Sequence, residues 1–235
     1  MNNPIYLVTN AKGRQLAVLL EKNEFKNNID AVISATDDDN CLVARRFDIR
    51  SIQLKMDTNT DFNRGLLESD LPSDSIFLSF GLTKLFLPEF LDQHPGKVFN
   101  SHFSMLPSFP GKLKSDWTAA KLGPRSIFER ALLYGVRFTG NTIHQVDASV
   151  DGGRPVIQSC MPIPYNTDQS ALRHLLFIQE CKCIFQFVDW VGCHRIEISP
   201  HGTYIRDADF SSHEFSPSIE AAWIKSFNID QDKFI

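Results

Sequence analysis

The stretch from Ser75 to Phe80 constrains the fold most, because it is a short, mostly apolar run between polar segments. A strand that is apolar on both faces is typical of a parallel sheet whose helices cover both sides. Similar runs occur over residues 5–8, 29–34 and 49–54, and the first is followed by leucines at helical spacing, namely Leu16, Leu19 and Leu20. This alternation of strand, loop and helix predicts an α/β fold with a doubly wound, mostly parallel sheet.

The chain has 235 residues, a length that suits one large or two small domains. No internal repeat or low-complexity linker interrupts it, so we expect a single catalytic domain over residues 1–200. Two alternating stretches around Pro200-His201-Gly202 predict a small β-hairpin, and the polar remainder predicts a C-terminal tail. We therefore expect a C-terminal appendage over residues 201–235.

The composition narrows the classes of function. A formal net charge of −4 argues against a sequence-independent nucleic-acid binder or a protein of anionic membranes. No apolar run reaches the roughly 18 residues that a membrane helix needs, and the start, Met-Asn-Asn-Pro, does not resemble a signal peptide. The five cysteines lack a Cys-x-x-Cys spacing, which favours free thiols over a disulfide framework or a metal site. We expect a cytoplasmic protein without a metal.

The stretch from Lys97 to Gly111 carries the first candidate site. Val98 and Phe99 end an apolar strand, and Asn100 and His102 follow two residues apart. In extended backbone they point to the same side. Side chains at the end of a strand in an α/β sheet are well placed for chemistry, because such folds bind ligands at the carboxyl ends of their strands.

A second stretch, Gly140 to Gln158, strengthens this interpretation. It contains a strand, a loop with Asp151 before Gly152 and Gly153, and then another strand. The pattern Asn-x-His-x-Ser-x-Leu-Pro followed by Asp-Gly-Gly between two strands resembles the formyl-tetrahydrofolate-dependent formyltransferases. Within them the chain is most similar to the phosphoribosylglycinamide (GAR) formyltransferases of purine synthesis, over most of residues 5–200.

The resemblance implies transfer of a formyl group from 10-formyltetrahydrofolate to a primary amine of a small phosphorylated or nucleotide-linked acceptor. Such a reaction needs a hydrogen-bond donor that stabilises the oxyanion and a group that transfers a proton. Asn100 suits the first task and His102 the second. Asp151 would then favour the imidazolium form of His102. His144 lies on a strand, where packing is the expected role.

The resemblance also implies the folate-binding residues. Backbone groups near Thr83, Lys84, Leu85 and Phe86 would hold the pterin ring, and the loop before Asp151 would add contacts from Asp147, Ala148, Ser149 and Val150. Arg64 falls roughly where the family has an active-site arginine. It is either that residue or a surface arginine.

On the acceptor side, the loop after the first strand would hold a phosphate through Lys12, Gly13 and Arg14, or is a plain turn. It has fewer glycines than the GAR enzymes have, so we expect an altered acceptor site. Residues 168–190 predict a long helix, on which Glu180 would contact the substrate or face solvent. Residues 112–127 look like an insertion, either a lid or a packing embellishment.

Other functions stay open. A sugar-nucleotide N-formyltransferase would use the same donor. A formyltetrahydrofolate hydrolase would keep Asn100, His102 and Asp151 but release formate, and a degenerate module would only bind folate. In each case the expected partners are folate and a small molecule, and the expected state is a monomer or homodimer.

Overall fold

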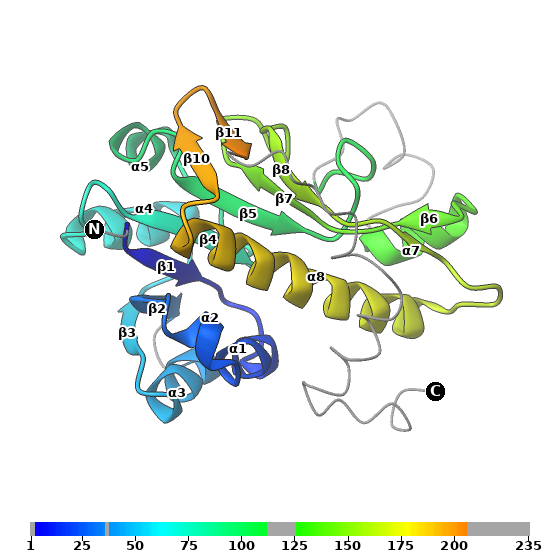
Figure 1. The fold of residues 1–235 in the computed structure, drawn as a ribbon, viewed down its shortest axis with the longest axis horizontal. Coiled ribbons are helices and arrows are strands. Elements are labelled where there is room, and N and C mark those ends of the chain that lie inside the picture. Colours follow the sequence, from blue (N-terminus) through cyan, green and yellow to red (C-terminus); the bar gives the residue numbers. More distant parts are fainter. Residues whose placement is uncertain (1–2, 36–37, 112–125, 206–235) are drawn as a thin grey trace.

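The computed structural model describes residues 3–35, 38–111 and 126–205 of the chain. Their centre is a seven-stranded sheet with the strand order β3-β2-β1-β4-β5-β7-β8 (Figure 1). Its strands are β1 (Ile5–Val8), β2 (Ala31–Ala35), β3 (Arg50–Leu54), β4 (Ile76–Phe80), β5 (Val98–His102), β7 (Thr142–Gln145) and β8 (Pro155–Gln158). The pairs among the first five strands are parallel, whereas β5 pairs antiparallel with β7 and β7 with β8. The predicted mostly parallel sheet is confirmed.

Helices cover both faces of this sheet, as the apolar strands predicted. One face packs against α1 (Arg14–Leu20), α2 (Asn23–Lys26), α3 (Asp39–Arg46) and the long α8 (Gln169–Gly192). The other face packs against α4 (Asn59–Glu68) and α5 (Pro88–Gln93). The alternation of side chains explains the two cores. In β1, Ile5 and Leu7 join the α8 side, and Tyr6 and Val8 join the α4 side.

A smaller unit adjoins the N-terminal turns of α8. Helix α7 (Ile127–Leu133) packs against the first turns of α8, and the short strands β6 (Phe138–Thr139) and β9 (Met161–Pro162) pair beside it (Figure 1). After α8 comes the predicted hairpin, formed by β10 (Ile196–Ser199) and β11 (Gly202–Ile205). The rest of the proposed appendage, residues 206–235, lies outside the described residues, as do residues 112–125 of the proposed insertion.

The strand order reverses at β1, which lies between β2 and β4. The loops after β1 and β4 meet at this point. The Asn10 side chain donates to Thr83 Oγ1 at 2.7 Å and accepts from the Thr83 amide at 2.9 Å. Gly81 has a φ of +55°, and a Cβ there would lie 2.6 Å from the Cβ of Ala11, so only glycine permits this close approach. In open α/β sheets ligands bind at such a reversal.

Helix α8 is fastened to the sheet by aromatic packing, which allows a test of the fold. The rings of Phe99 and Phe187 are both fully buried, and their centroids lie 4.7 Å apart. Phe187→Ala should lower the free energy of unfolding by about 3–5 kcal/mol, because it leaves a cavity between helix and sheet. Urea unfolding would measure this. Leu42→Ala, at a side chain that is 59% exposed, is the control and should cost less than about 0.5 kcal/mol. Similar losses in the two variants would contradict the packing.

Candidate active site

The antiparallel pairing of β5 and β7 builds the first part of the site. Asn100 lies directly opposite His144, and Asn100 and His102 share one side of β5, as predicted. Ser79 on β4 donates through Oγ to Asn100 Oδ1 at 2.9 Å, which fixes the orientation of the amide. Asn100 Nδ2 lies 3.3 Å from His144 Nε2. Because an amide nitrogen carries two hydrogens, one N–H of Asn100 is left for a ligand.

The loop between β7 and β8 brings Asp151 back to these residues. Asp151 adopts a left-handed backbone with a φ of 53°. At Gly153 a Cβ would lie 1.8 Å from the Gln145 carbonyl oxygen, and at Gly152 it would lie 2.1 Å from Ser149 Oγ. Gly153 is therefore required so that the loop can fold over the end of β7, and Gly152 leaves room for the Ser149 side chain. This is the physical reason for the Asp-Gly-Gly motif.

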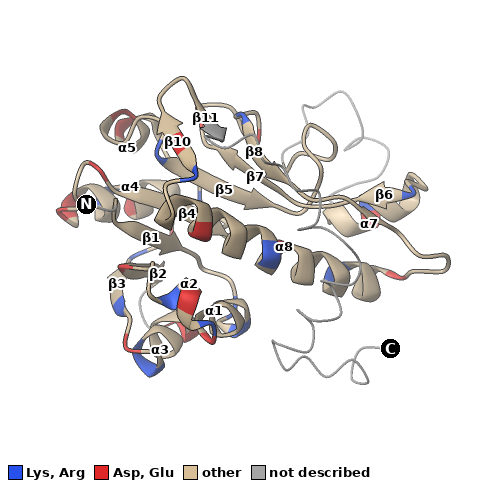
Figure 2. Ribbon diagram, in the orientation of Figure 1, with Lys and Arg blue, Asp and Glu red and all other residues tan. Residues whose placement is uncertain are grey.

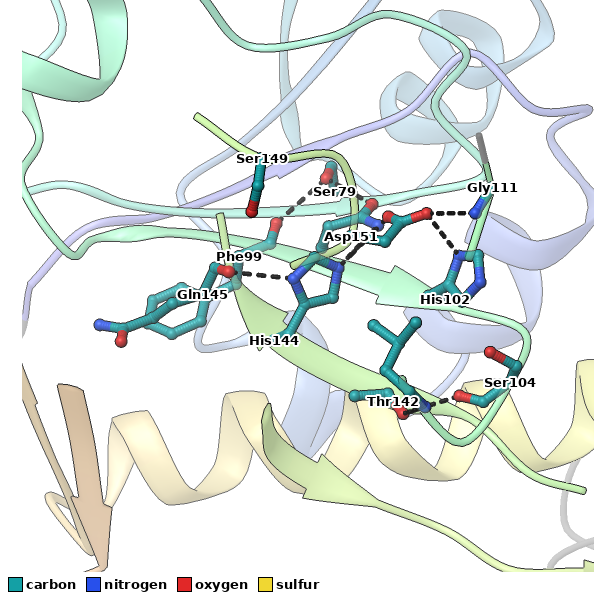
Figure 3. Close-up of polar contacts among 12 residues, drawn as sticks. Ser79, Phe99, His102, Ser104, Gly111, Thr142, His144, Gln145, Ser149 and Asp151 are labelled. Carbon is teal, nitrogen blue, oxygen red and sulfur yellow. Dashed lines mark hydrogen bonds and ion pairs between the residues drawn. The ribbon is translucent and has the colours of Figure 1, made fainter. Parts of the chain in front are cut away.

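Asp151 lies between two histidines, as Figure 3 shows. Its Oδ2 accepts a hydrogen bond from the Gly111 amide at 2.6 Å and lies 3.6 Å from His102 Nδ1. Its Oδ1 lies 3.6 Å from His144 Nε2. The side chains of Asp151 and His102 are 12% and 13% exposed, so the cluster is largely shielded from water but still reachable.

His144 is the residue that the sequence interpretation missed. Packing was the expected role, yet its ring contacts both Asn100 and Asp151. Its Nδ1 lies 2.9 Å from the Gln145 carbonyl oxygen, to which it can donate, and Nε2 then accepts from Asn100. One sequence signal was present: in the predicted strand 142–146, His144 follows the apolar Ile143, so the two side chains point to opposite faces, and the structure places Ile143 in the α8 core.

Burial decides the protonation of His102. It lowers the pKa of His102 below the ordinary 6.5, while Asp151 and the Phe109 carbonyl oppose the shift. The imidazole Nε2 contacts that carbonyl oxygen at 3.0 Å, which leaves Nδ1 as the nitrogen that can take up a proton beside Asp151. The resting ring is therefore neutral at pH 7. Asp151 favours the imidazolium form, as expected, but burial outweighs this effect.

The pKa of Asp151 moves in the opposite sense to what burial alone would cause. Burial raises it, but the contact with His144, the neighbouring His102 and the Gly111 amide together lower it to about 2. Asp151 is thus charged throughout the physiological range and can stabilise a proton that arrives on His102.

Arg130 supports the loop that carries these contacts. This side chain of α7 is 5% exposed and donates through Nη2 to the Pro110 carbonyl at 2.9 Å and the Phe109 carbonyl at 3.4 Å. It thereby holds the chain that leads to Gly111. Its charge also lowers the pKa of His102 as a minor cause. Arg130 was not among the site residues predicted from the sequence.

A cavity of about 320 Å³, here named the β5 cavity, opens at this cluster. Asn100, His102, His144 and Asp151 line it together with most of the residues proposed for folate binding, which are Lys84, Leu85, Phe86, Asp147, Ala148, Ser149 and Val150. Thr83 stands just outside its lining and binds Asn10. Arg64 lies elsewhere, in a surface depression with Gln53 and Glu68.

The backbone of residues 83–86 is only partly available to a ligand. The Thr83 amide donates to Asn10, and the Leu85 amide donates to Asn59 Oδ1 at 3.1 Å. The Leu85 carbonyl accepts from Asn63 at 2.8 Å. Within the described residues, the backbone groups of Lys84 and Phe86 have no such partner, so these are the groups that could bind the edge of a pterin ring.

The acceptor-side residues fall into three environments. Lys12 and Arg14 line a second cavity of about 640 Å³, here named the α8 cavity, which shares Gly81 and Phe103 with the β5 cavity. Gly13 is buried, and a Cβ there would lie 3.0 Å from Val43. Glu180 is completely buried beneath β5 and lines neither cavity. Its contact with a substrate stays a prediction.

Residues 12–188 match the family described as formyl transferase. The chain belongs to this family. It is 28% identical to the phosphoribosylglycinamide formyltransferase of Mycobacterium tuberculosis over 123 residues, which are 52% of this chain and 51% of that protein. The chain thus spans about half the length of this curated relative.

Two solved structures have the same fold. The glycinamide ribonucleotide transformylase 1 of Symbiobacterium toebii gives a TM-score of 0.72 at 23% identity, over 88% of this chain and 95% of that one. A formyltetrahydrofolate deformylase from Pseudomonas syringae gives 0.69 at 18% identity, over 88% and 67%. The fold is therefore shared by a transformylase and a deformylase, and the fold alone does not identify the acceptor. No described helix is long and apolar enough to cross a membrane.

The pKa of His102 provides a test of the cluster. Because the charge on Asp151 opposes the effect of burial, Asp151→Asn should lower the pKa of His102 further. An NMR titration of the His102 ring would measure the change. Asp147→Asn, at an exposed carboxylate of the same loop, is the matched control and should leave the value in place. A pKa that stays the same or rises in Asp151→Asn would show that the carboxylate does not act on this ring.

Glu180 gives a second prediction, on stability. Its Oε2 accepts from Gln15 at 2.6 Å, whereas Oε1 has no partner among the described residues, and burial raises its pKa from 4.5 to about 7. Folding therefore favours the protonated acid, and stability should fall as the pH rises from about 4.5 to 7. Glu180→Gln removes this penalty, which is on the order of 3 kcal/mol. Urea unfolding of Glu180→Gln should show a higher free energy of unfolding than the unmodified protein at pH 8 and almost the same value at pH 4.5. Exposed Glu89→Gln is the control, and an equal gain at both pH values would refute the buried charge.

Proposed function

We propose that the protein transfers a formyl group from 10-formyltetrahydrofolate to a primary amine of a small acceptor. The observation that carries this is the convergence of Asn100, His102 and Asp151 at one cavity that the two proposed folate loops also line. Family membership supports the transfer of a formyl group, because the matched family is described as formyl transferase.

The residues divide the chemistry between them. The amine nitrogen attacks the formyl carbon, the carbonyl oxygen becomes an oxyanion, and the bond from carbon to the folate nitrogen breaks. Asn100 donates its remaining N–H to the oxyanion, and because Ser79 and His144 hold the amide, little reorganisation is needed. The products are the formylated amine and tetrahydrofolate.

The proton follows a path through His102. The neutral ring takes a proton from the attacking amine on Nδ1, where Asp151 stabilises the resulting charge. The ring then gives the proton to the departing folate nitrogen. The low pKa of His102 favours the second transfer, since a weakly basic ring releases its proton readily.

A hydrolase is the second candidate, and the fold of the Pseudomonas deformylase favours it. Water would replace the amine, and the same residues would serve. The α8 cavity argues against a hydrolase, because it adjoins the β5 cavity at Gly81 and Phe103 and could hold an acceptor larger than water. A sugar-nucleotide N-formyltransferase and a folate-binding module remain alternatives within the same fold.

Product analysis separates these functions. The protein is incubated with 10-formyltetrahydrofolate alone and with GAR and other phosphorylated or nucleotide-linked amines, and formate, tetrahydrofolate and formylated amines are quantified. We expect folate release that depends on an amine, with GAR a poor substrate because of the altered loop after β1. Formate without an amine would identify a hydrolase. Efficient GAR formylation, at about 10⁴ M⁻¹s⁻¹ or more, would contradict the altered-acceptor claim.

The role of His102 is tested in the same assay. His102→Ala should lower kcat by about 10²–10⁴-fold, as is usual for a group that transfers a proton in the transition state. His201→Ala, at an exposed residue of the hairpin, is the control and should retain full activity. Circular dichroism would show that both variants are folded. Near-normal turnover in His102→Ala would remove this residue from the mechanism.

A further inference from the structure

The α8 cavity has an unusual charge for this chain. Lys12 and Arg14 come from the first loop and α1, and Arg173 and His174 come from α8; the described residues that line the cavity include no carboxylate. Figure 2 shows basic residues on both α1 and α8. The whole chain carries a net charge of −4, so this concentration of bases is local. A cavity of one charge sign attracts ligands of the opposite sign.

Aromatic rings form the other part of the cavity wall. Phe103, Phe128 and Phe177 all line it. The guanidinium of Arg14 lies 5.8 Å from the ring centre of Phe177, and that of Arg173 lies 5.1 Å from the ring centre of Phe128. Each arginine is therefore oriented by a ring as well as charged. An ion and a flat apolar group could bind here side by side.

His174 adds a hydrogen-bonding group rather than a further charge. Burial lowers the pKa of His174 below 6.5, and the nearby Arg14 lowers it further. At pH 7 the ring is neutral, and three positive charges remain, on Lys12, Arg14 and Arg173. Arginine side chains bind phosphate and carboxylate oxygens in pairs, which suits an acceptor with an oxyanion group.

Part of the backbone of the first loop already has partners within the protein. The Ala11 amide already donates to Thr9 Oγ1 at 3.2 Å, and the Ala11 carbonyl accepts from Asn40 at 2.6 Å. Gly13 is packed against Val43 and Asp39. Helix α1 has only seven residues and has no side-chain cap. The charged side chains of Lys12, Arg14 and Arg173 are therefore the groups that could attract an anion to this cavity.

We propose that the α8 cavity binds an amine acceptor that joins a phosphate, or a similar oxyanion, to a planar ring, with Arg173 and Phe177 as specificity-determining residues. This inference rests on the proposed formyl transfer. The anion binds Arg14 and Arg173, the ring packs on Phe177, and the amine points past Gly81 and Phe103 towards His102. These two residues lie where the α8 and β5 cavities meet.

Three probes separate the contributions of ring and anion. Pyridoxamine 5′-phosphate has an amine, a planar ring and a phosphate; pyridoxamine lacks the phosphate; phosphoethanolamine lacks the ring. Calorimetric titration of the full chain without folate measures each dissociation constant. We expect the complete probe to bind at least about tenfold more tightly than either partial one, since each lost group removes a contact worth about a factor of ten. Equal binding of pyridoxamine and its phosphate would overturn the anion site, and equal binding of the two phosphates would overturn the ring site.

Two variants assign the contacts. Arg173→Gln should weaken binding of both phosphorylated probes about tenfold and leave pyridoxamine unchanged. Phe177→Ala should weaken the two ring probes and spare phosphoethanolamine. Arg46→Gln, at an exposed arginine of α3 outside both cavities, is the matched control and should change none of the three. If Arg173→Gln leaves the phosphorylated probes unaffected, the assignment of Arg173 is wrong.

The calorimetric experiment also distinguishes the two proposals, because it needs no formyl donor. Probe binding that follows the expected pattern, combined with no formyl transfer to any amine, would refute the proposed function and leave the ligand class of the cavity standing. Conversely, a folate analogue that binds in the β5 cavity, together with no detectable binding of any probe, would refute the ligand class alone.

Discussion

The antiparallel pairing of β5 with β7 is the constraint on which the site depends. Every neighbouring pair from β3 to β5 in the sheet is parallel, and the strand direction first reverses at the pair β5–β7. The change places His144 opposite Asn100 and turns the following loop back towards His102. The loop after β7 begins beside the start of β5, where Gln145 lies opposite Phe99, and it folds back along the strands. This places the carboxylate of Asp151 between the two imidazoles.

Burial sets the chemical character of the groups gathered there. The same exclusion of water that makes His102 a weak base also makes its interaction with Asp151 stronger, because charges attract more in a low dielectric. Asp151 stays ionised because several donors face it. Glu180 is completely buried, and this burial outweighs the hydrogen bond from Gln15, so its pKa rises instead. Two carboxyl groups in one domain thus differ in protonation through the depth of their burial and the groups that face them.

The two cavities differ in how they could recognise a ligand. The β5 cavity presents backbone groups and the side chains of Asn100, His102 and Asp151, and Asn59 and Asn63 hold its 83–86 loop through hydrogen bonds. The α8 cavity presents charged and aromatic side chains from helices. Backbone recognition tolerates changes in sequence, whereas recognition by side chains changes whenever one of them is replaced. A shared donor with a divergent acceptor is the expected result within such a family.

Local sequence determined the parts of this protein that depend on neighbours in the chain. The apolar runs predicted the doubly wound sheet, the spacing of Asn100 and His102 placed them on one side of β5, and the motif at Asp151 marked the loop. Only the tertiary structure decided the role of His144, the burial of Glu180 beside Gln15 and the gathering of Arg14 with Arg173. Those outcomes depend on strand register and on helix packing between segments that are far apart in the chain. Periodicity shows which face of an element is apolar, but it does not show which other element will cover that face.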